Sequence, residues 1–481
     1  MASSFSETVQ ALIRAAILSM LVVVCCGCPT ANDATVTEPE SVAGDTTPAA
    51  TGPLRVTVLD DTPLAAILAR EWNARSEQQI EIIETSVDDL LTKLQAGLDR
   101  LETDVVIYPS ALLGELAERK LLRTMPRELA DEPDFAFTEI FGLIRRRETQ
   151  WNSQPYAVPL GTPPLVLLRR TDLVPDAPST WTELSAEVDR LRASTTNGLV
   201  PLAQPLTDGW AAKMLQARSA AYMFDRSRVS SVFDYSTMTP RIAEPPFVRA
   251  LEELAADNVG ASTDLAPGDV LKQFLEGRCA MAITWPAAIL EELDPPEFPM
   301  AVSELPGTTD QFLFATDEWK STSDGELIRV SLIGTDGRLG SVSLAAKNPS
   351  LGNIFLAWAA GREQSRKLSP RSQHTAPFRA SHAGNAADWV QPQIPAEVAT
   401  EYVAVVESAL SRSEAYQTPR LPGQHLYMQK LDAAVHLVLA GAEPAKTALE
   451  KVAADWEQIT DSLDRVKQKA AYRKSLGIKV R

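Results

Sequence analysis

The most constraining feature of the sequence is the alternation of strand-like and helix-like segments that follows its N-terminal part. Residues 54–59 alternate apolar and polar side chains as a strand does, and residues 64–72 place apolar side chains at helical spacing. Residues 79–85 and 103–108 predict two further strands, with a helix over 87–101 between them. Strands that alternate with helices predict an α/β fold with largely parallel sheets.

Acidic and hydroxyl side chains follow the ends of these predicted strands. Asp60 and Asp61 come directly after the first strand, in a turn where Thr62 suits the N-cap position of the next helix. Tyr108 and Ser110 lie at or just past the end of the third strand. Because open α/β sheets bind ligands at the carboxyl ends of their strands, these residues are candidates for a binding edge.

The middle of the chain contains a proline-broken segment over residues 155–170. Two extended pieces flank Gly161–Pro164, which indicates a chain that passes from one lobe to another. A helix is predicted to open after Ser179 or Thr180, either of which can cap it. A later strand is predicted near residues 340–347.

The C-terminal third of the chain is rich in predicted helices and does not continue the strand–helix alternation. The apolar spacing predicts helices over residues 352–361, 396–411, 424–439 and 444–463.

The N-terminal 27 residues have the pattern of a signal peptide. Residues 15–24 are apolar or small except for Ser19, and ten helical residues cover about 15 Å, half of a bilayer core. Three cysteines follow, and Gly27 before Cys28 best fits a lipoprotein processing site. Lipidation at Cys25 or Cys26, and a plain secretory signal with incidental cysteines, remain alternatives.

Residues 28–53 predict a lipidated cysteine followed by a disordered tether. The segment 29–53 has four acids, no bases and no aromatic residues, so it cannot bury enough apolar area to offset its ordering entropy. After cleavage, Cys279 is the one remaining cysteine besides the lipidated one, so no intrachain disulfide is expected.

The charge of the chain excludes several classes of protein. With 63 acids and 46 bases the formal charge is −17, which argues against nucleic-acid binding and against attachment to anionic lipid by charge. Four histidines without paired cysteine motifs make a structural zinc site unexpected, and we expect neither a metal nor a cofactor. No hydrolase elbow, zincin motif or phosphate-binding loop is present, so we expect no enzyme.

The order of the motifs resembles that of the family 1 extracellular solute-binding proteins of ABC importers, the maltose-binding-protein-like group. The resemblance covers nearly everything after the tether, and the stretch Gly277–Trp285 carries it most strongly. The segment 310–339 departs from the family as an insertion, in which Asp336–Gly337 has the composition of a hairpin turn. The other matching segments are Asp60–Asp61, Glu71–Asn73, Thr103–Tyr108, Tyr156–Thr162, Ser179–Glu183, Pro377–Arg379 and Ala448–Trp456.

The resemblance implies two α/β lobes of the periplasmic-binding-protein type II fold, each a mostly parallel sheet flanked by helices, with the ligand in the cleft between them. The first lobe is expected over 54–158 with a return at 341–392. The second lobe is expected over 159–340, with the C-terminal helices of 393–481 mainly belonging to it.

Aromatic residues are the natural partners of a sugar, which offers a face of C–H groups and a rim of hydroxyls. Trp285 ends a buried-looking strand and Trp210 lies in a loop entering a helix, so each is a candidate for the ligand or for lobe packing. Tyr427, near the start of a C-terminal helix, is a further candidate. Four other tryptophans lie in apolar helices and are expected in the core: Trp72, Trp181, Trp358 and Trp456.

The remaining polar candidates are less specific. Arg379 can donate to a ligand or pair with an acid across the lobes. His374 and His382 form either a metal pair or, as we expect, ordinary polar positions of a loop. Asp60 and Asp61 also suit plain turn and capping positions.

These patterns lead to one hypothesis with two alternatives. We expect a lipid-anchored solute-binding protein that captures a sugar or oligosaccharide and delivers it to the membrane subunits of an ABC permease, as a monomer in the cell envelope. The globular part is expected in the periplasm or extracytoplasmic space. The alternatives are a lipoprotein for ligand sensing or surface binding, and a secreted carbohydrate-active enzyme with two catalytic carboxylates.

Overall fold

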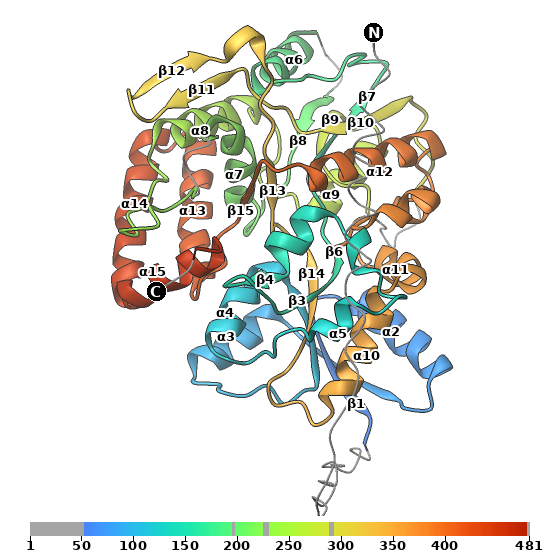
Figure 1. The fold of residues 1–481 in the computed structure, drawn as a ribbon. Coiled ribbons are helices and arrows are strands. Elements are labelled where there is room, and N and C mark those ends of the chain that lie inside the picture. The colour runs from blue at the N-terminus through green and yellow to red at the C-terminus, as the bar shows by residue number, and fades with distance from the viewer. Residues whose placement is uncertain (1–51, 195–197, 225–229, 288–292, 479–481) are drawn as a thin grey trace, which may run out of the picture. The chain divides into compact units, whose positions relative to one another are not determined.

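The computed structural model describes residues 52–194, 198–224, 230–287 and 293–478, which contain two main sheets, each with its own helices (Figure 1). The expected signal peptide, the lipidated Cys28 and nearly all of the tether lie outside the described residues. Within the described residues, no helix combines the length and the apolar character needed to cross a membrane.

The first sheet has five strands in the order β2-β1-β3-β14-β6, and all strands except β14 run in the same direction. Its strand β3 is buried over its first four residues, as expected for a strand covered on both faces. The strands are β1 (Leu54–Leu59), β2 (Ile80–Thr85), β3 (Val105–Pro109), β6 (Val158–Gly161) and β14 (Arg338–Val342).

The helices of the first lobe lie between or after these strands in the chain. They are α2 (Thr62–Arg75), α3 (Val87–Gln95), α4 (Leu113–Glu118), α5 (Arg127–Ala130), α10 (Pro349–Ala360) and α11 (Arg362–Leu368). A short hairpin of β4 (Gln150–Trp151) and β5 (Gln154–Pro155) precedes β6.

The second sheet has four strands in the order β10-β7-β9-β8, and only β7 runs against the others. All six residues of β9 are buried. The strands are β7 (Val166–Arg170), β8 (Val200–Ala203), β9 (Cys279–Thr284) and β10 (Met300–Glu304). One reversed strand in each sheet confirms the expected α/β fold with mostly parallel sheets.

The second lobe draws its helices from the middle and the end of the chain. Helix α12 packs against β10, and α13 packs against α7 and α14. The last helix, α15, contacts α4 and β4 of the first lobe. These helices are α6 (Trp181–Ser194), α7 (Ala211–Tyr222), α8 (Pro245–Asp257), α9 (Pro267–Leu275), α12 (Ala396–Ser411), α13 (Gln424–Leu439), α14 (Ala445–Ser462) and α15 (Arg465–Ser475).

Three stretches of chain connect the lobes. The first runs from β6 to β7, across Thr162 and the prolines that follow it. The second runs from β13 (Ser331–Ile333) to β14, and the third leads from α11 to α12. Strand β13 pairs in parallel with β15 (Ala415–Gln417), which lies between α12 and α13 (Figure 1). The expected lobe boundary at residue 341 falls inside β14.

The segment 310–339 does contain a hairpin, but not at the expected turn. Strands β11 (Asp310–Leu313) and β12 (Glu318–Ser321) form it, with residues 314–317 as the turn. Asp336–Gly337 instead joins β13 to β14, which pair with different sheets. The prediction of a hairpin turn at Asp336–Gly337 is therefore wrong, since a local turn signal does not specify which strands will pair.

Helix caps also differ in one place. The N-cap of α2 is Asp61, whose carboxylate accepts a hydrogen bond from Leu64 N at 3.2 Å, and not Thr62 as predicted. Thr180 caps α6 as expected, because its hydroxyl accepts from Glu183 N at 3.1 Å.

Candidate functional site

The first half of the candidate site is a buried charge cluster at the carboxyl end of β1. Asp61 accepts a hydrogen bond from Ser372 Oγ at 2.5 Å and lies 3.3 Å from Arg338 Nε. Arg338 is 1% exposed and begins the reversed strand β14, so its side chain starts at the edge where β1 ends. Its Nη2 donates to Asp60 O at 3.1 Å, which ties the two strands together.

Asp336 and His374 extend this cluster. His374 Nδ1 lies 2.6 Å from one carboxylate oxygen of Asp336, and Arg338 Nη1 lies 3.4 Å from the other. Burial alone would raise the pKa of Asp336, but His374 and then Arg338 and Lys213 lower it to about 2. Asp336 is therefore ionised and compensated by neighbouring cations.

The second half of the site is an aromatic pair at the carboxyl end of the second sheet. Trp285 directly follows β9, and its ring centroid lies 5.5 Å from that of Trp210, the N-cap of α7. Trp285 Nε1 donates to Gln373 O at 2.8 Å, and Gln373 adjoins the Ser372 that binds Asp61. This hydrogen bond joins the aromatic pair to the charge cluster across the two lobes.

Lys213, in the first turn of α7, adds a cation to the aromatic pair. Its Nζ lies 4.1 Å from the ring centroid of Trp210. Burial lowers the pKa of Lys213, while Asp336 and Asp432 act in the opposite direction. Asp432 of α13 accepts from Gly209 N at 3.0 Å and from Ala212 N at 2.8 Å, so it caps α7 from a distant part of the chain.

Gln204 is the first residue after β8 and lies at the same edge of the second sheet. Its side chain is fully buried, yet neither its amide nitrogen nor its amide oxygen has a hydrogen-bond partner. Buried amides are nearly always satisfied, so an unpaired one at a strand end marks a place where a ligand can supply the missing bonds.

Three of the predicted residues adjoin the charge cluster without entering it. Asp60 is exposed and accepts a hydrogen bond from Val87 N at 2.9 Å. Ser110 is buried and its backbone N–H donates to Gly337 O at 2.9 Å. Tyr108 is buried within the sheet, where its hydroxyl lies 2.7 Å from Ser341 Oγ and burial raises its pKa.

Two other predicted residues lie apart from the site. Arg379 is fully buried and donates to the carbonyl oxygens of Phe135 and Ala360, which holds segments of the first lobe together. Tyr427 is also fully buried, with its hydroxyl 3.0 Å from Thr460 Oγ1. Both side chains are occupied by structural contacts, so we leave them out of the proposed site.

The two histidines of the same loop serve separate contacts. His374 pairs with Asp336, whereas His382 is buried and lies 2.9 Å from Ser365 Oγ through Nε2. Its Nδ1 accepts from Phe378 N at 3.3 Å, so both of its ring nitrogens are engaged. The four tryptophans expected in the core are indeed buried.

The structure adds site residues that the sequence did not single out. Gln204 carried a usable signal, because it follows a strand just as Ser110 does. Lys213 has the spacing of an ordinary helical surface position. Arg338 and Ser372 come from the segment taken as an insertion and from a loop, and their partners are distant in sequence. Asp336 and His374 were considered only as a turn residue and as a loop residue, and they also join the cluster.

A buried carboxyl lies where the connecting stretches meet. Glu148 is fully buried, Thr162 Oγ1 donates to it, and Arg420 Nη1 donates to its backbone carbonyl at 2.7 Å. Burial raises the pKa of Glu148. A Cβ added at Gly337 would lie 3.0 Å from Gly161 O and 3.1 Å from Glu148 Oε1, so the first two connections approach closely because glycine stands there.

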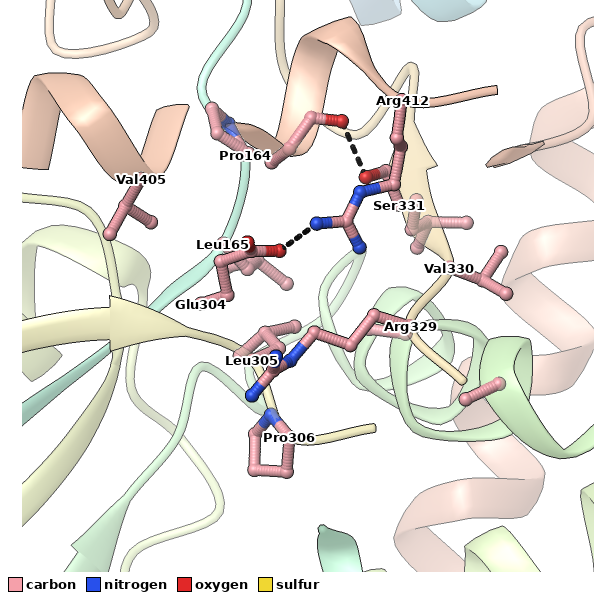
Figure 2. A pocket seen from close by; sticks show the side chains of 14 residues that line it. Pro164, Leu165, Glu304, Leu305, Pro306, Arg329, Val330, Ser331, Val405 and Arg412 are labelled. Atoms are coloured by element: carbon pink, nitrogen blue, oxygen red, sulfur yellow. Dashed lines mark hydrogen bonds and ion pairs between the residues drawn. The ribbon is translucent and has the colours of Figure 1, made fainter. Parts of the chain in front are cut away.

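A small pocket lies on the second-lobe side of the connections, shown in Figure 2. Pro164 and Leu165 of the first connection line it, together with Arg329–Leu332 before the second. An ion pair between Glu304 and Arg412 closes one side (Figure 2). Its volume of about 30 Å³ accommodates about two water molecules and excludes a sugar.

Comparison with protein families gives one match. Residues 68–396 match the family model of the bacterial extracellular solute-binding proteins. No curated protein sequence matches the chain.

Comparison with solved structures gives the fold. An ABC transporter solute-binding protein from Agrobacterium radiobacter, in complex with ribitol, has a TM-score of 0.65 and 17% identity, and the match covers 86% of this chain and 100% of that one. Maltose-bound MalE3 of T. maritima has a TM-score of 0.61 and 16% identity over 84% of this chain and 100% of that one. The sugar-binding protein MalE of Xanthomonas citri has a TM-score of 0.65 and 14% identity, and the match covers 86% of this chain and 98% of that one.

Proposed function

Because the chain belongs to the bacterial extracellular solute-binding protein family, we propose that it captures a carbohydrate between its lobes and delivers it to an ABC importer. The observation that carries this proposal is the Trp210–Trp285 pair, which lies at the carboxyl end of one sheet and is joined to the charge cluster at the carboxyl end of the other. Such sheet edges are where α/β proteins bind ligands.

The two halves of the site match the two faces of a sugar. The indole rings offer flat apolar surface for C–H groups, and the carboxylates and the guanidinium offer hydrogen bonds for hydroxyls. The proposed binding residues are Asp61, Gln204, Trp210, Lys213, Trp285, Asp336, Arg338 and His374. The ribitol and maltose bound to the similar proteins are themselves rich in hydroxyl groups.

Ligand binding must involve a movement of the lobes. Trp285 is only 3% exposed and its indole nitrogen is bound to Gln373 O of the other lobe, so the lobes have to part before a sugar reaches the rings. A ligand that touches both lobes then favours closure by its differential affinity for the closed form. The permease reads that closed form, and the protein performs no covalent chemistry.

The first test concerns the aromatic pair. Trp285→Ala should weaken carbohydrate binding by at least about 2 kcal/mol, roughly thirtyfold, if the ring is a stacking surface at the centre of the site. Titration calorimetry against a panel of mono- and oligosaccharides measures this. Trp319→Ala is the matched control, because Trp319 is 37% exposed on the β11–β12 hairpin and lies outside the proposed site.

Two results would contradict the proposal. An unchanged dissociation constant for Trp285→Ala removes the aromatic pair from the site. Hydrolysis or other turnover of a bound sugar, detected by chromatography of the ligand, would show that the protein is an enzyme.

Delivery and anchoring need tests of their own. Deleting the gene should abolish uptake of the labelled ligand, and binding without any effect on uptake would indicate a sensing or surface-binding protein. We also propose that the chain is anchored in the cell envelope through lipid on Cys28, with its globular part outside the cytoplasm. Cys28→Ala should then lose incorporation of labelled fatty acid, and continued labelling would contradict this assignment.

A further inference from the structure

Lys213 places a positive charge directly on the proposed sugar-binding surface. Its ammonium group lies 4.1 Å from the ring centroid of Trp210, and Trp210 lies 5.5 Å from Trp285. A sugar that stacks on these rings therefore brings its substituents within reach of the ammonium group.

The carboxylates around Lys213 are already engaged by other groups. Asp61 has Arg338 and the hydroxyl of Ser372, and Asp336 has Arg338 and His374. Each acid of the charge cluster therefore has a cation at ion-pair distance that is not Lys213.

Asp432, the third nearby acid, binds two backbone N–H groups at the start of α7. Over the part of the chain that the structure describes, no carboxylate lies within ion-pair distance of Lys213, and its one direct polar contact is with the indole ring. Lys213 is thus a cation of the site that has acids nearby but no carboxylate at ion-pair distance.

Gln204 is an independent sign of a missing polar partner at the same edge. Its amide is fully buried and makes no hydrogen bond in the described residues. A buried amide without partners costs free energy, which a polar ligand can offset. An anionic oxygen accepts from the amide NH₂ group as well as from an ammonium group, and a sugar hydroxyl can donate to the amide oxygen.

Taking the proposed function as its premise, we propose that the bound carbohydrate is anionic, with a carboxylate or a sulfate ester that Lys213 binds. A neutral hydroxyl would give Lys213 a hydrogen bond but would bring no opposite charge within ion-pair distance in a partly buried place. An anionic group supplies both the hydrogen bond and the opposite charge. Such a charge-assisted hydrogen bond is stronger than one to a neutral hydroxyl. Most of the −17 charge of the chain is distant and is screened beyond about 10 Å at 0.1 M salt. Asp336 and Asp432 lie near enough to act on Lys213, so the anionic group has to contact the ammonium group directly.

The experiment compares sugars that differ only in charge. Titration calorimetry is run with galactose and galacturonate oligomers of one to three rings, with glucose and glucuronate, and with the corresponding sulfated sugars. We expect at least one acidic sugar to bind at least tenfold more tightly than its neutral partner. The uronate and sulfate arms distinguish the two sources of negative charge.

Variants of Lys213 assign the preference to its side chain. Lys213→Gln should reduce the affinity for the acidic sugar at least tenfold more than it reduces the affinity for the neutral partner, and should keep the melting temperature. Lys213→Arg should restore part of the preference. Lys430→Gln, which removes an exposed lysine of α13 paired with Asp455, is the control for a change in net charge.

The other possible outcomes distinguish the proposed carbohydrate-binding function from the proposed anionic ligand. Neutral sugars that bind as tightly as acidic ones overturn the anionic ligand and leave the carbohydrate-binding function standing. A preference that survives Lys213→Gln removes Lys213 from the proposal. A panel in which no sugar binds overturns the proposed function and this inference with it.

Discussion

Helix α7 carries two cationic side chains that each contact an indole ring, and they differ in whether they form an ion pair. Arg218 lies 4.5 Å from the ring centroid of Trp181, is fully buried, and forms ion pairs with Asp257 at 2.5 Å and Glu253 at 3.6 Å. Lys213, near the other end of the helix, lies over Trp210, and among the described residues no carboxylate is at ion-pair distance from it.

The difference separates a cation that holds the fold from one that is left for a ligand. A buried charge is tolerated when its partner is built into the protein, as at Arg218. A cation at a sheet edge without a carboxylate at ion-pair distance, as at Lys213, keeps its bonding capacity for another molecule. Pairing, and not residue type or contact with an aromatic ring, is what distinguishes the two.

The largest expected effect is on the paired cation. Arg218→Met should lower the free energy of unfolding by about 3–5 kcal/mol, because Asp257 would remain buried without its cation. Urea unfolding followed by tryptophan fluorescence measures the change.

Arg278→Met is the matched control for this variant. Its partner Glu276 forms a surface pair in which Arg278 is 59% exposed, and such pairs contribute about 0–1 kcal/mol. An Arg218 variant as stable as the control would erase the distinction between the two ends of α7.

Gln204→Met should change stability and affinity in opposite directions. Removing an unsatisfied buried amide is expected to raise the free energy of unfolding by roughly 1–3 kcal/mol, while carbohydrate binding weakens. Thermal unfolding and calorimetry on the same preparation measure both. A loss of stability would mean that the amide has a structural partner after all.

His382 is a third case, a buried basic side chain whose neutral form is favoured. Burial, and then Arg379 and Arg366, hold the pKa of His382 well below 6.5. The unfolded chain therefore takes up a proton near pH 6.5 that the folded protein does not, so stability should fall below that pH by up to about 1.4 kcal/mol per unit. His382→Gln should remove this slope in unfolding curves measured from pH 7.5 to 5, and an unchanged slope would assign it to other groups.

The smallest expected effect is that of Lys213 on the unliganded protein. Lys213→Met should change the free energy of unfolding by less than about 1 kcal/mol, because no ion pair is lost. A decrease as large as that of Arg218→Met would show that Lys213 also holds the fold.

The fold was largely predictable from local patterns. Helices α12 and α13 begin and end at the predicted residues, and the strands that contain Val58, Ile107 and Ile283 lie where alternation or buried runs placed them. Local patterns suffice here because each element buries its own apolar face. They failed at Asp336–Gly337, where the partner strands and not the turn residues decide the structure.

The candidate site was predictable only in part. Asp61, Trp210 and Trp285 could be found because strand ends and helix starts are visible in a single sequence. Arg338 and Ser372 could not, since they meet Asp61 only when segments about 300 residues apart come together. Burial in a local contact, as at Tyr427, has no sequence signal that distinguishes it from exposure in a cleft.

The cap that Asp432 provides for α7 has a consequence for the newly made chain. Asp432 follows Ala212 by 220 residues, so at about 5–20 residues per second the helix waits roughly 11–44 s for its cap during synthesis. The edge of the second sheet that carries Trp210 and Lys213 cannot be completed in that interval. A factor that acts on the growing chain therefore contacts a second lobe whose binding edge has not yet formed. That edge forms only after the C-terminal helices have been synthesised.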